Sequence, residues 1–319
     1  MNNAERTAGR RSRRSVVAAM SVLLFIAVPA AAALFGDPFA VSIATQIVIY
    51  ALAAVSLDLI LGYGGMVSFG HAAYFGIGAY AVAIAAAAGI DQALITWPLA
   101  IASAALLGLG IGALSVRTSG IFFIMITLAF AQMVFYLIIG LKTFGGDDGL
   151  SMTARNVLPF VDLRNPTLYY YVCLIALLAY TYLCARIVDS RFGMVLRGTR
   201  KNERRLVALG YQVYRYKLVA FVISAAGAGL AGALFANNAR IASPDLASWP
   251  TSGNVMMMVI LGGVGTLFGP MFGAAAFVGL QTWLAGLTEH WALPLGMFVI
   301  AVVLFANRGL FGVIAGRDE

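Results

Sequence analysis

Charged side chains are scarce in this sequence. Asp, Glu, Lys and Arg make up 11% of its 319 residues, whereas soluble domains carry about 25%. Hydrophobic residues account for 61%, and the mean hydropathy is +0.91. So few charges cannot cover the surface of a soluble globule of this length. The composition therefore predicts an integral membrane protein.

Cysteine and histidine are almost absent, with two residues of each. Cys173 and Cys184 are eleven residues apart in one apolar run, which is about 16 Å along a helix and too far for a disulfide. The two histidines, His71 and His290, lie far apart in the sequence. The chain therefore has no metal-ligand spacing, and we expect neither a metal nor another cofactor.

Lysine is also rare, which bears on the source of energy. A phosphate-binding loop has the pattern Gly-x-x-x-x-Gly-Lys-[Ser/Thr]. The three lysines, Lys142, Lys201 and Lys217, follow Leu, Arg and Tyr, so none completes this pattern. The sequence also offers no paired carboxylates and no nucleophile beside a base. We therefore expect no enzyme, and any transport must be driven by a partner or by an ion gradient.

Long apolar runs are what the sequence has in abundance. They are continuous and about 20 residues long, which is the length of a membrane-spanning helix and not the alternating pattern of a barrel strand. The sequence therefore predicts an all-α polytopic membrane protein with eight to ten transmembrane helices. The expected segments are 16–36, 39–61, 67–90, 93–116, 119–141, 167–187, 217–237, 253–269, 271–288 and 291–307.

Positive charges are distributed unevenly between alternate loops. Cytoplasmic loops of membrane proteins are enriched in Lys and Arg. With a cytoplasmic N-terminus, all 21 Lys and Arg residues fall on the inner side except Lys142, Arg155, Arg164 and Arg240. The net charge of +8 then reflects topology and not nucleic-acid binding. The expected regions are a basic cytoplasmic tail (1–15), a transmembrane domain (16–307) with a cytoplasmic loop (189–216) and an external loop (142–166), and a cytoplasmic tail (308–319).

Two apolar tracts are unusually rich in glycine. Six of the twenty residues in 61–80 are glycine, and residues 261–273 have a similar composition. Glycine destabilises a helix by about 1 kcal/mol relative to alanine, and paired glycine-interrupted segments point to a transporter's pathway. We therefore expect segments 67–90 and 253–269 to be broken or re-entrant, and their recurrence is consistent with an internal repeat.

Candidate pathway or gate residues lie in and beside these tracts. They are Asp58, Gly64, Gly65, Ser68, His71, Gly262, Gly263 and Gly265. Backbone that is loosened at a break exposes amide and carbonyl groups to a polar solute, which makes Ser68 the first candidate. Asp58 either reaches cytoplasmic water, caps the broken segment or lines a gate, where it could pair with His71. His71 is either a structural histidine or a substrate contact.

The segment 189–210 is the longest charged stretch. Helical spacing places five basic residues on one face: Arg197, Arg200, Lys201, Arg204 and Arg205. Apolar or small residues lie on or near the other face: Val195, Thr199, Leu206, Leu209 and Val213. Gly210 is suited to end the helix. We predict an amphipathic cytoplasmic helix with Arg200 as a peripheral charge, and it either rests on anionic headgroups or docks a partner protein.

Five stretches of the sequence resemble one family of membrane proteins. They are LGYGG at 61–65 with SFGH at 68–71 and GIGAY at 76–80; TLAFAQ at 127–132; GGDDGL at 145–150; NE at 202–203 with ALG at 208–210 and YKLVAFVIS at 216–224; and LGGVGTLFGP at 261–270. Over residues 40–313 the chain is similar to the M-type permease subunits of branched-chain amino acid ABC importers, the LivM-like family.

The resemblance implies partners and a role for the charged segment. In that family the permease pairs with a related H-type permease subunit, and two cytoplasmic ATP-binding subunits and a periplasmic substrate-binding protein complete the importer. The chain would then lie in a bacterial inner membrane. Segment 192–210 would be the coupling helix that contacts an ATPase, and its expected contact residues are Arg197, Arg200, Glu203, Leu206, Leu209 and Gly210.

Some positions depart from the family pattern. ABC permeases commonly have Glu and Gly six residues apart, whereas Glu203 and Gly210 are seven apart. Asp58 stands where an asparagine-like residue is expected, and Asn254 stands where an acidic residue is common. Because members also import urea, short amides and aromatic acids, the resemblance implies a class of small polar solutes of which branched-chain amino acids are the central case.

An ion-coupled secondary transporter is the alternative function. Such a transporter needs ionisable residues within its spans. Asp58, His71 and Glu289 are the candidates here, and the last two could lie at interfaces. This scarcity favours a passive conduit that partner subunits drive.

Overall fold

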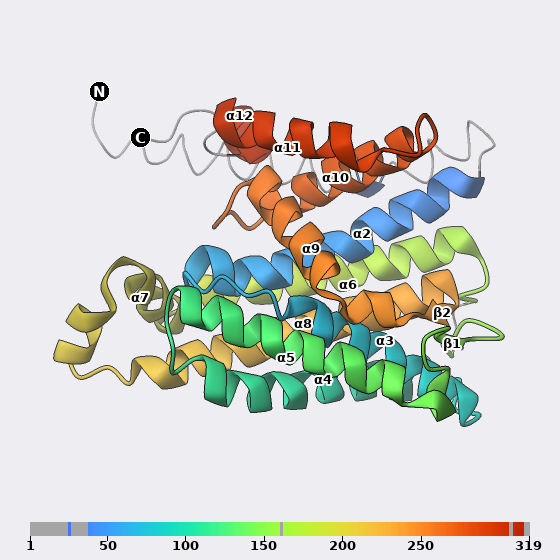
Figure 1. The fold of residues 1–319 in the computed structure, drawn as a ribbon, viewed down its shortest axis with the longest axis horizontal. Coiled ribbons are helices and arrows are strands. Elements are labelled where there is room, and N and C mark those ends of the chain that lie inside the picture. Colours follow the sequence, from blue (N-terminus) through green and yellow to red (C-terminus); the bar gives the residue numbers. More distant parts are fainter. Residues whose placement is uncertain (1–24, 27–37, 160–161, 306–308, 316–319) are drawn as a thin grey trace.

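The protein is a bundle of helices whose longest members run side by side along one axis (Figure 1). The computed structural model describes residues 25–26, 38–159, 162–305 and 309–315. Within these ranges, five segments are long and apolar enough to cross a membrane. They are α2 (Pro38–Asp58) continued by the π-helical turn η1 (Leu59–Tyr63), α4 (Ala93–Ser115), α5 (Ile121–Gly140), α6 (Pro166–Val188) and α8 (Val213–Ala239). The predicted all-α membrane fold is confirmed.

Shorter helices complete the bundle. They are α3 (His71–Ala87), α7 (Arg191–Ala208), α9 (Trp249–Gly262), α10 (Gly269–Ala285), α11 (Ala292–Phe305) and α12 (Gly309–Ala315). The predicted segments from 39–61 onward match observed helices to within about one turn, with one exception. The exception is 253–269, because α9 begins and ends earlier. The predicted segment 16–36 and both terminal tails lie outside the described residues, apart from 25–26 and 309–315.

The centre of the bundle is built from small residues, which let α3 and α8 approach closely. A Cβ atom on Gly78 would overlap the backbone of Gly229, and one on Gly232 would overlap the carbonyl of Phe75. Close approach of this kind is how membrane helices associate when hydrophobic burial gives little net gain. The residues that recur every four positions along α8 are all buried: Ser224, Ala228, Gly232 and Ala236.

The two ends of the bundle are built differently. α7 lies at one end, on the same side as the connection between α4 and α5 (Figure 1). At the opposite end, β1 (Leu150–Ser151) pairs antiparallel with β2 (Ile241–Ala242). Arg155, in the same loop as β1, donates a 3.2 Å hydrogen bond to the carbonyl of Asn237 and lies 4.6 Å from the centre of the Tyr169 ring. The described part of the loop 142–166 is therefore fixed to the bundle.

The glycine-rich breaks lie between helices and not within them. Residues 64–70 connect η1 to α3, and residues 263–268 connect α9 to α10. Both predicted segments, 67–90 and 253–269, therefore contain a non-helical stretch, but this stretch lies at one end of each segment and not in its middle. α3 has 17 residues and α9 has 14, which at 1.5 Å per residue is about 26 and 21 Å. Both helices fall short of a hydrocarbon core of about 30 Å, so each leaves part of that depth to non-helical chain.

Candidate functional site

The first glycine tract enters the bundle as a connection with alternating exposure. Met66, Ser68 and Gly70 are buried, whereas Val67 and Phe69 are half-buried. Non-helical backbone at membrane depth needs internal hydrogen bonds, and this connection has them. The amide of residue 66 donates to the carbonyl of residue 60 at 2.9 Å, and the amide of residue 69 donates to the hydroxyl of Thr127 in α5 at 3.3 Å.

Ser68 and His71 are tied into this connection by hydrogen bonds. Each side chain is 1% exposed. The Ser68 hydroxyl accepts a 3.2 Å bond from the amide of Gly70, and Nε2 of His71 lies 2.8 Å from the hydroxyl of Ser56. In this conformation both residues hold the break in place. Their direct contact with a substrate stays a prediction.

Sequence reasoning missed two serines that support the same connection. The hydroxyl of Ser252 in α9 accepts a 2.9 Å bond from the amide of Ala72, at the start of α3. Ser56 lies in the last turn of α2, just before η1 begins at Leu59. Its carbonyl accepts a 2.5 Å hydrogen bond from the hydroxyl of Ser224. Both serines are completely buried. The available signal was a hydroxyl in an apolar run near a glycine break, which sequence alone cannot pair with a distant partner.

Asp58 joins the two glycine tracts. Its Oδ1 atom accepts a 2.8 Å hydrogen bond from the amide of Gly265, which is 207 positions away in the sequence. The residue is only 2% exposed, so it does not reach cytoplasmic water. The expected pairing with His71 is also wrong, because His71 contacts Ser56 instead.

Glycine is required where the tracts meet. A Cβ atom on Gly62 would overlap Oδ1 of Asp58 and lie 2.5 Å from the amide nitrogen of Gly265. Gly265 has a φ of +79°, a backbone conformation that only glycine adopts at little cost. The remaining candidate glycines have other close neighbours: Gly64 faces the carbonyl of Ile60, Gly65 the stem of Arg200 and Gly262 the carbonyl of Gly269. Gly263 has a φ of +120°.

The helix that was predicted within residues 189–210 is present as α7, but it is not one continuous helix. Asn202 has extended backbone angles (φ −161°, ψ 96°), which divide α7 in two. The Asn202 side chain accepts a 3.1 Å bond from the amide of Arg205 and so begins the second part. Gly210 follows the end of α7 with a φ of +85°, which confirms it as the stop.

This division separates the apolar residues that the sequence placed on one face. Val195 and Thr199 are buried against the bundle. Leu206 is half-buried, and a Cβ atom on Gly198 would lie 3.0 Å from it. Leu209 is 67% exposed. The prediction of a single apolar face is therefore wrong, because a helical repeat cannot be carried across non-helical backbone.

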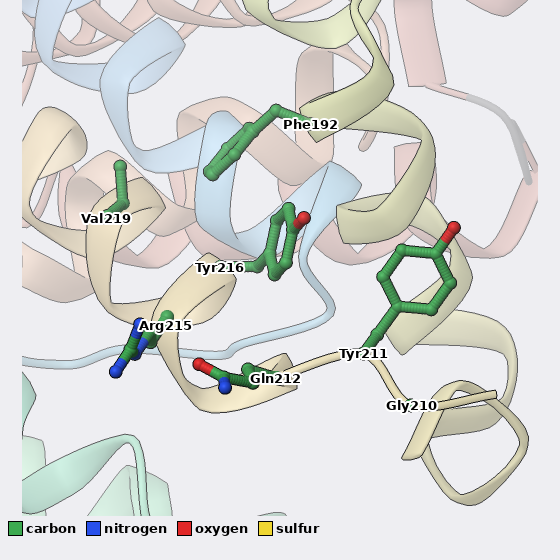
Figure 2. Close-up of a pocket in the computed structure, with 7 residues that line it drawn as sticks. All are labelled: Phe192, Gly210, Tyr211, Gln212, Arg215, Tyr216 and Val219. Atoms are coloured by element: carbon green, nitrogen blue, oxygen red, sulfur yellow. The ribbon is translucent and has the colours of Figure 1, made fainter. Parts of the chain in front are cut away.

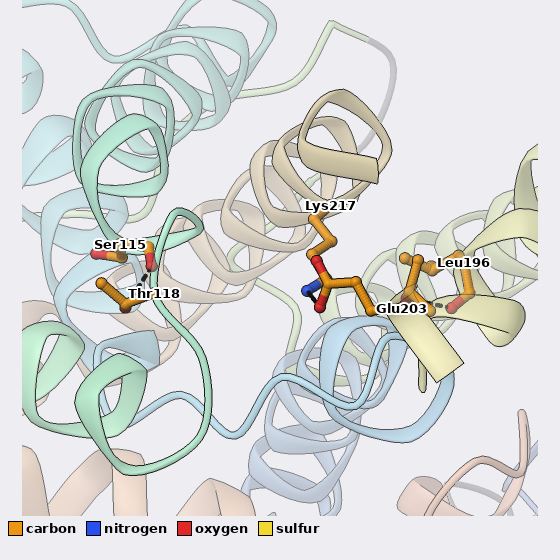
Figure 3. A network of polar contacts seen from close by, with 6 residues as sticks. Ser115, Thr118, Leu196, Glu203 and Lys217 are labelled. Carbon is orange, nitrogen blue, oxygen red and sulfur yellow. Dashed lines mark hydrogen bonds and ion pairs between the residues drawn. The ribbon is translucent and has the colours of Figure 1, made fainter. Parts of the chain in front are cut away.

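Two charged residues of α7 bind the bundle. Nζ of Lys217 in α8 lies 2.6 Å from Oε2 of Glu203, and the lysine side chain is 9% exposed (Figure 3). Nη1 of Arg200 donates a hydrogen bond to the carbonyl of Gly62. Arg200 is exposed as a residue, as expected for a peripheral charge, but its guanidinium is tied to the bundle, which the sequence did not predict. The remaining basic residues of the predicted face are also exposed: Arg197, Lys201, Arg204 and Arg205.

An open aromatic pocket of about 510 Å³ lies where α7 meets α8 (Figure 2). The rings of Phe192 and Tyr216 are 5.3 Å apart, and Tyr211 lies 6.3 Å from Tyr216. Arg215 supplies a positive charge to the same pocket. Leu209 and Val207, which is 58% exposed, lie just before it in the chain. Unpaired apolar and aromatic groups thus gather at this end of the molecule.

No group of three or more His, Cys, Asp or Glu residues suited to a metal ion occurs in the described part of the chain. Cys173 and Cys184 are both buried and free. The chemistry of the site therefore comes from backbone amides and carbonyls, hydroxyl groups and a few charges. Such groups can guide and gate a solute.

Comparison with known proteins agrees with this geometry. The sequence profile of the branched-chain amino acid transport system permease component family matches residues 39–307. The chain belongs to this family. The match covers both glycine tracts and α7, so the features described above lie within the family's shared region.

Individual relatives from this permease family are distant but similar over most of their length. The high-affinity branched-chain amino acid transport system permease protein LivM of Salmonella typhimurium is 27% identical over 297 residues, covering 85% of this chain and 69% of the relative. LivM of Escherichia coli is 28% identical over the same shares. A probable LivM of Methanocaldococcus jannaschii is 27% identical over 270 residues, covering 72% of this chain and 76% of the relative. No solved structure matches the chain.

Proposed function

We propose that this chain is the transmembrane permease subunit of an ABC importer and forms half of a pathway for branched-chain amino acids or related small polar solutes. The observation that carries this proposal is the family match over both glycine tracts, together with the contact that joins those tracts at one end of the bundle. The relatives are named as branched-chain amino acid permeases.

The proposed pathway runs beside the first break. In this break the half-buried residues are Val67 and Phe69, and both are apolar. They would contact the aliphatic part of a substrate, while backbone groups of the break would meet its polar end. The glycines Gly64, Gly65, Gly262, Gly263 and Gly265, with Asp58, would form the gate. Ser68 and His71 would support it.

The proposed partners are an H-type permease subunit, two cytoplasmic ATP-binding subunits and a periplasmic substrate-binding protein. Only 28% of the most apolar stretch of α4, and of α5, is buried within this chain. These helices therefore need lipid or a second permease against them. The proposed location is the bacterial inner membrane, with both termini and residues 189–216 in the cytoplasm and residues 142–166 outside.

Transport by the complete importer tests this proposal. The chain is reconstituted with its partner subunits in vesicles, and uptake of labelled leucine is measured with the binding protein outside. Uptake should require ATP on the side of α7 and should persist when a protonophore and a sodium ionophore are present. Uptake that needs no ATP and stops with the ionophores would establish the ion-coupled alternative. Competition by valine, urea and benzoate then defines the substrate class.

A further inference from the structure

One residue of α7, Arg200, contacts both glycine tracts. The Arg200 guanidinium donates to the carbonyl of Gly62 in the first tract. A Cβ atom on Gly265, in the second tract, would lie 3.3 Å from Nη1 of Arg200. The stem of Arg200 also packs on the first tract, because a Cβ atom on Gly65 would lie 2.9 Å from its Cγ. One side chain of α7 therefore fills the junction between the tracts.

Asp58 closes the same junction from inside the bundle. Its Oδ1 atom binds the amide of Gly265 at 2.8 Å, and its Oδ2 atom is buried without a hydrogen-bond partner among the described residues. Asp58 and Arg200 thus bind the junction from opposite sides, Asp58 through the amide of Gly265 and Arg200 through the carbonyl of Gly62.

α7 has contacts with the bundle besides those of Arg200. Its own residues Leu196 and Thr199 are buried, and its Glu203 pairs with Lys217 of α8 at 2.6 Å. These contacts lie on both sides of Arg200 in the sequence. The attachment of α7 to the bundle therefore does not rest on Arg200 alone.

We propose that Arg200 and Asp58 form a latch that transmits the position of α7 to the glycine tracts. This inference rests on the proposed permease function. Arg200 is a positioning residue: when α7 moves, its guanidinium leaves the carbonyl of Gly62, and the two tracts are held together only by Asp58. A planar guanidinium donates to a carbonyl in a fixed direction while its flat face and stem pack on the neighbouring backbone. Lysine, with one ammonium on a flexible stem, serves this geometry less well.

The test compares transport with ATP hydrolysis in the same vesicles. Arg200→Gln, Arg200→Lys and the matched control Arg186→Gln are each reconstituted with all partner subunits. Arg186 is an exposed arginine near the end of α6, in the segment that leads to α7, so the control removes the same charge outside α7. Leucine uptake, ATP hydrolysis and the amount of copurified ATP-binding subunit are measured for each variant.

In Arg200→Gln, uptake per ATP hydrolysed should fall about tenfold, which is a typical size for lost coupling between sites. The ATP-binding subunits should remain bound and active. Arg200→Lys should lie between this variant and the wild type, and Arg186→Gln should match the wild type. An Asp58→Asn and Arg200→Gln double variant should match Arg200→Gln, because Asn keeps the acceptor for the Gly265 amide and adds no second loss to the latch.

Two results would overturn the latch. An unchanged ratio of uptake to hydrolysis in Arg200→Gln would show that the contact transmits nothing. Loss of the ATP-binding subunits would show that Arg200 is a docking residue. If Arg200→Gln does not reach the membrane, Arg200→Lys decides by the same ratio, and an unchanged ratio again overturns the latch. These outcomes require ATP-dependent uptake by the wild type, whose absence would instead contradict the proposed function.

Discussion

Asp58 is a carboxylate at the end of an otherwise apolar helix. It is 2% exposed, and one of its oxygens accepts the amide of Gly265. The amide of Gly265 has no other acceptor at hand except the carbonyl of Gly62, since its close neighbours are the Gly62 backbone and the Arg200 guanidinium. A side chain that accepts a hydrogen bond at position 58 is therefore more important for the fold than the negative charge itself.

Substitutions at Asp58 should separate these two properties. Asp58→Asn retains an oxygen that can accept the Gly265 amide, so uptake should stay within about twofold of the wild type, a change of less than 1 kcal/mol. Asp58→Leu leaves that amide unpaired, which costs about 1–3 kcal/mol, and it should lower both uptake and the melting temperature of the purified subunit. Equal losses in Asn and Leu variants would show that the charge is what matters.

α7 shows how one interrupted element serves two surfaces. Its first part packs Val195 and Thr199 onto the bundle, and its second part leads to exposed Val207 and Leu209. The interruption at Asn202 lies between them. A docking surface for an ATP-binding subunit is therefore expected after Asn202 and around the aromatic pocket.

Leu209→Asp should detach the ATP-binding subunits. A desolvated, unpaired carboxylate costs several kcal/mol, compared with about 8 kcal/mol for an entire micromolar contact. Copurification of the ATP-binding subunits and uptake should fall together, while the subunit itself keeps its melting temperature because Leu209 is exposed.

Leu206→Asp is the informative comparison. Leu206 is half-buried against Gly198, so this change should also lower the melting temperature. Full copurification with Leu209→Asp would place the docking surface elsewhere.

The two glycine-rich connections leave no room for larger side chains, so the size of the residue at these positions should decide whether the chain can transport. Gly64→Leu would place a side chain 2.7 Å from the carbonyl of Ile60, and Gly263→Leu would force a branched residue into a φ of +120°. The first change creates a steric clash with backbone, and the second creates a strained conformation that costs about 1–3 kcal/mol, so both variants should block uptake. Gly110→Leu is the matched control, since nothing lies within 4 Å of a Cβ there. Normal uptake by either tract variant would mean that these glycines do not gate the pathway.

At the scale of the whole molecule, the loops at the two ends of the bundle differ in charge. The end with α7 carries many basic residues, and the end with β1 and β2 carries Asp147 and Asp148 in an exposed turn (Figure 1). The excess of Lys and Arg near cytoplasmic ends of spans then predicts which end faces inward.

Single cysteines test this orientation. Asp148→Cys and Lys201→Cys both occupy exposed positions, and the background lacks Cys173 and Cys184. In intact cells an impermeant thiol reagent should modify position 148 and spare position 201, whereas both should react after the membrane is permeabilised. Modification of position 201 in intact cells would reverse the topology. Gly149 is unsuitable for this experiment because it has a φ of +80°.

The sequence by itself determined the helical bundle, the approximate positions of its apolar helices from residue 39 onward except for 253–269, and the location of the two glycine-rich breaks. These properties follow from local composition: apolar length specifies a span, and glycine content marks a break in it. α7 was also recognisable, since charge and apolar spacing are local. The predicted internal repeat and the predicted domain boundaries stay predictions.

Only the tertiary structure decided how these parts connect. The bond of Asp58 to Gly265 joins positions 207 residues apart, and that of Arg200 to Gly62 joins positions 138 apart. No local pattern encodes such pairs, because each depends on where whole helices pack. The interruption at Asn202 was hidden for a related reason. Helical spacing assigns faces only while the backbone stays helical. Asn202 has non-helical backbone angles, and on either side of it Arg200 and Glu203 contact the bundle.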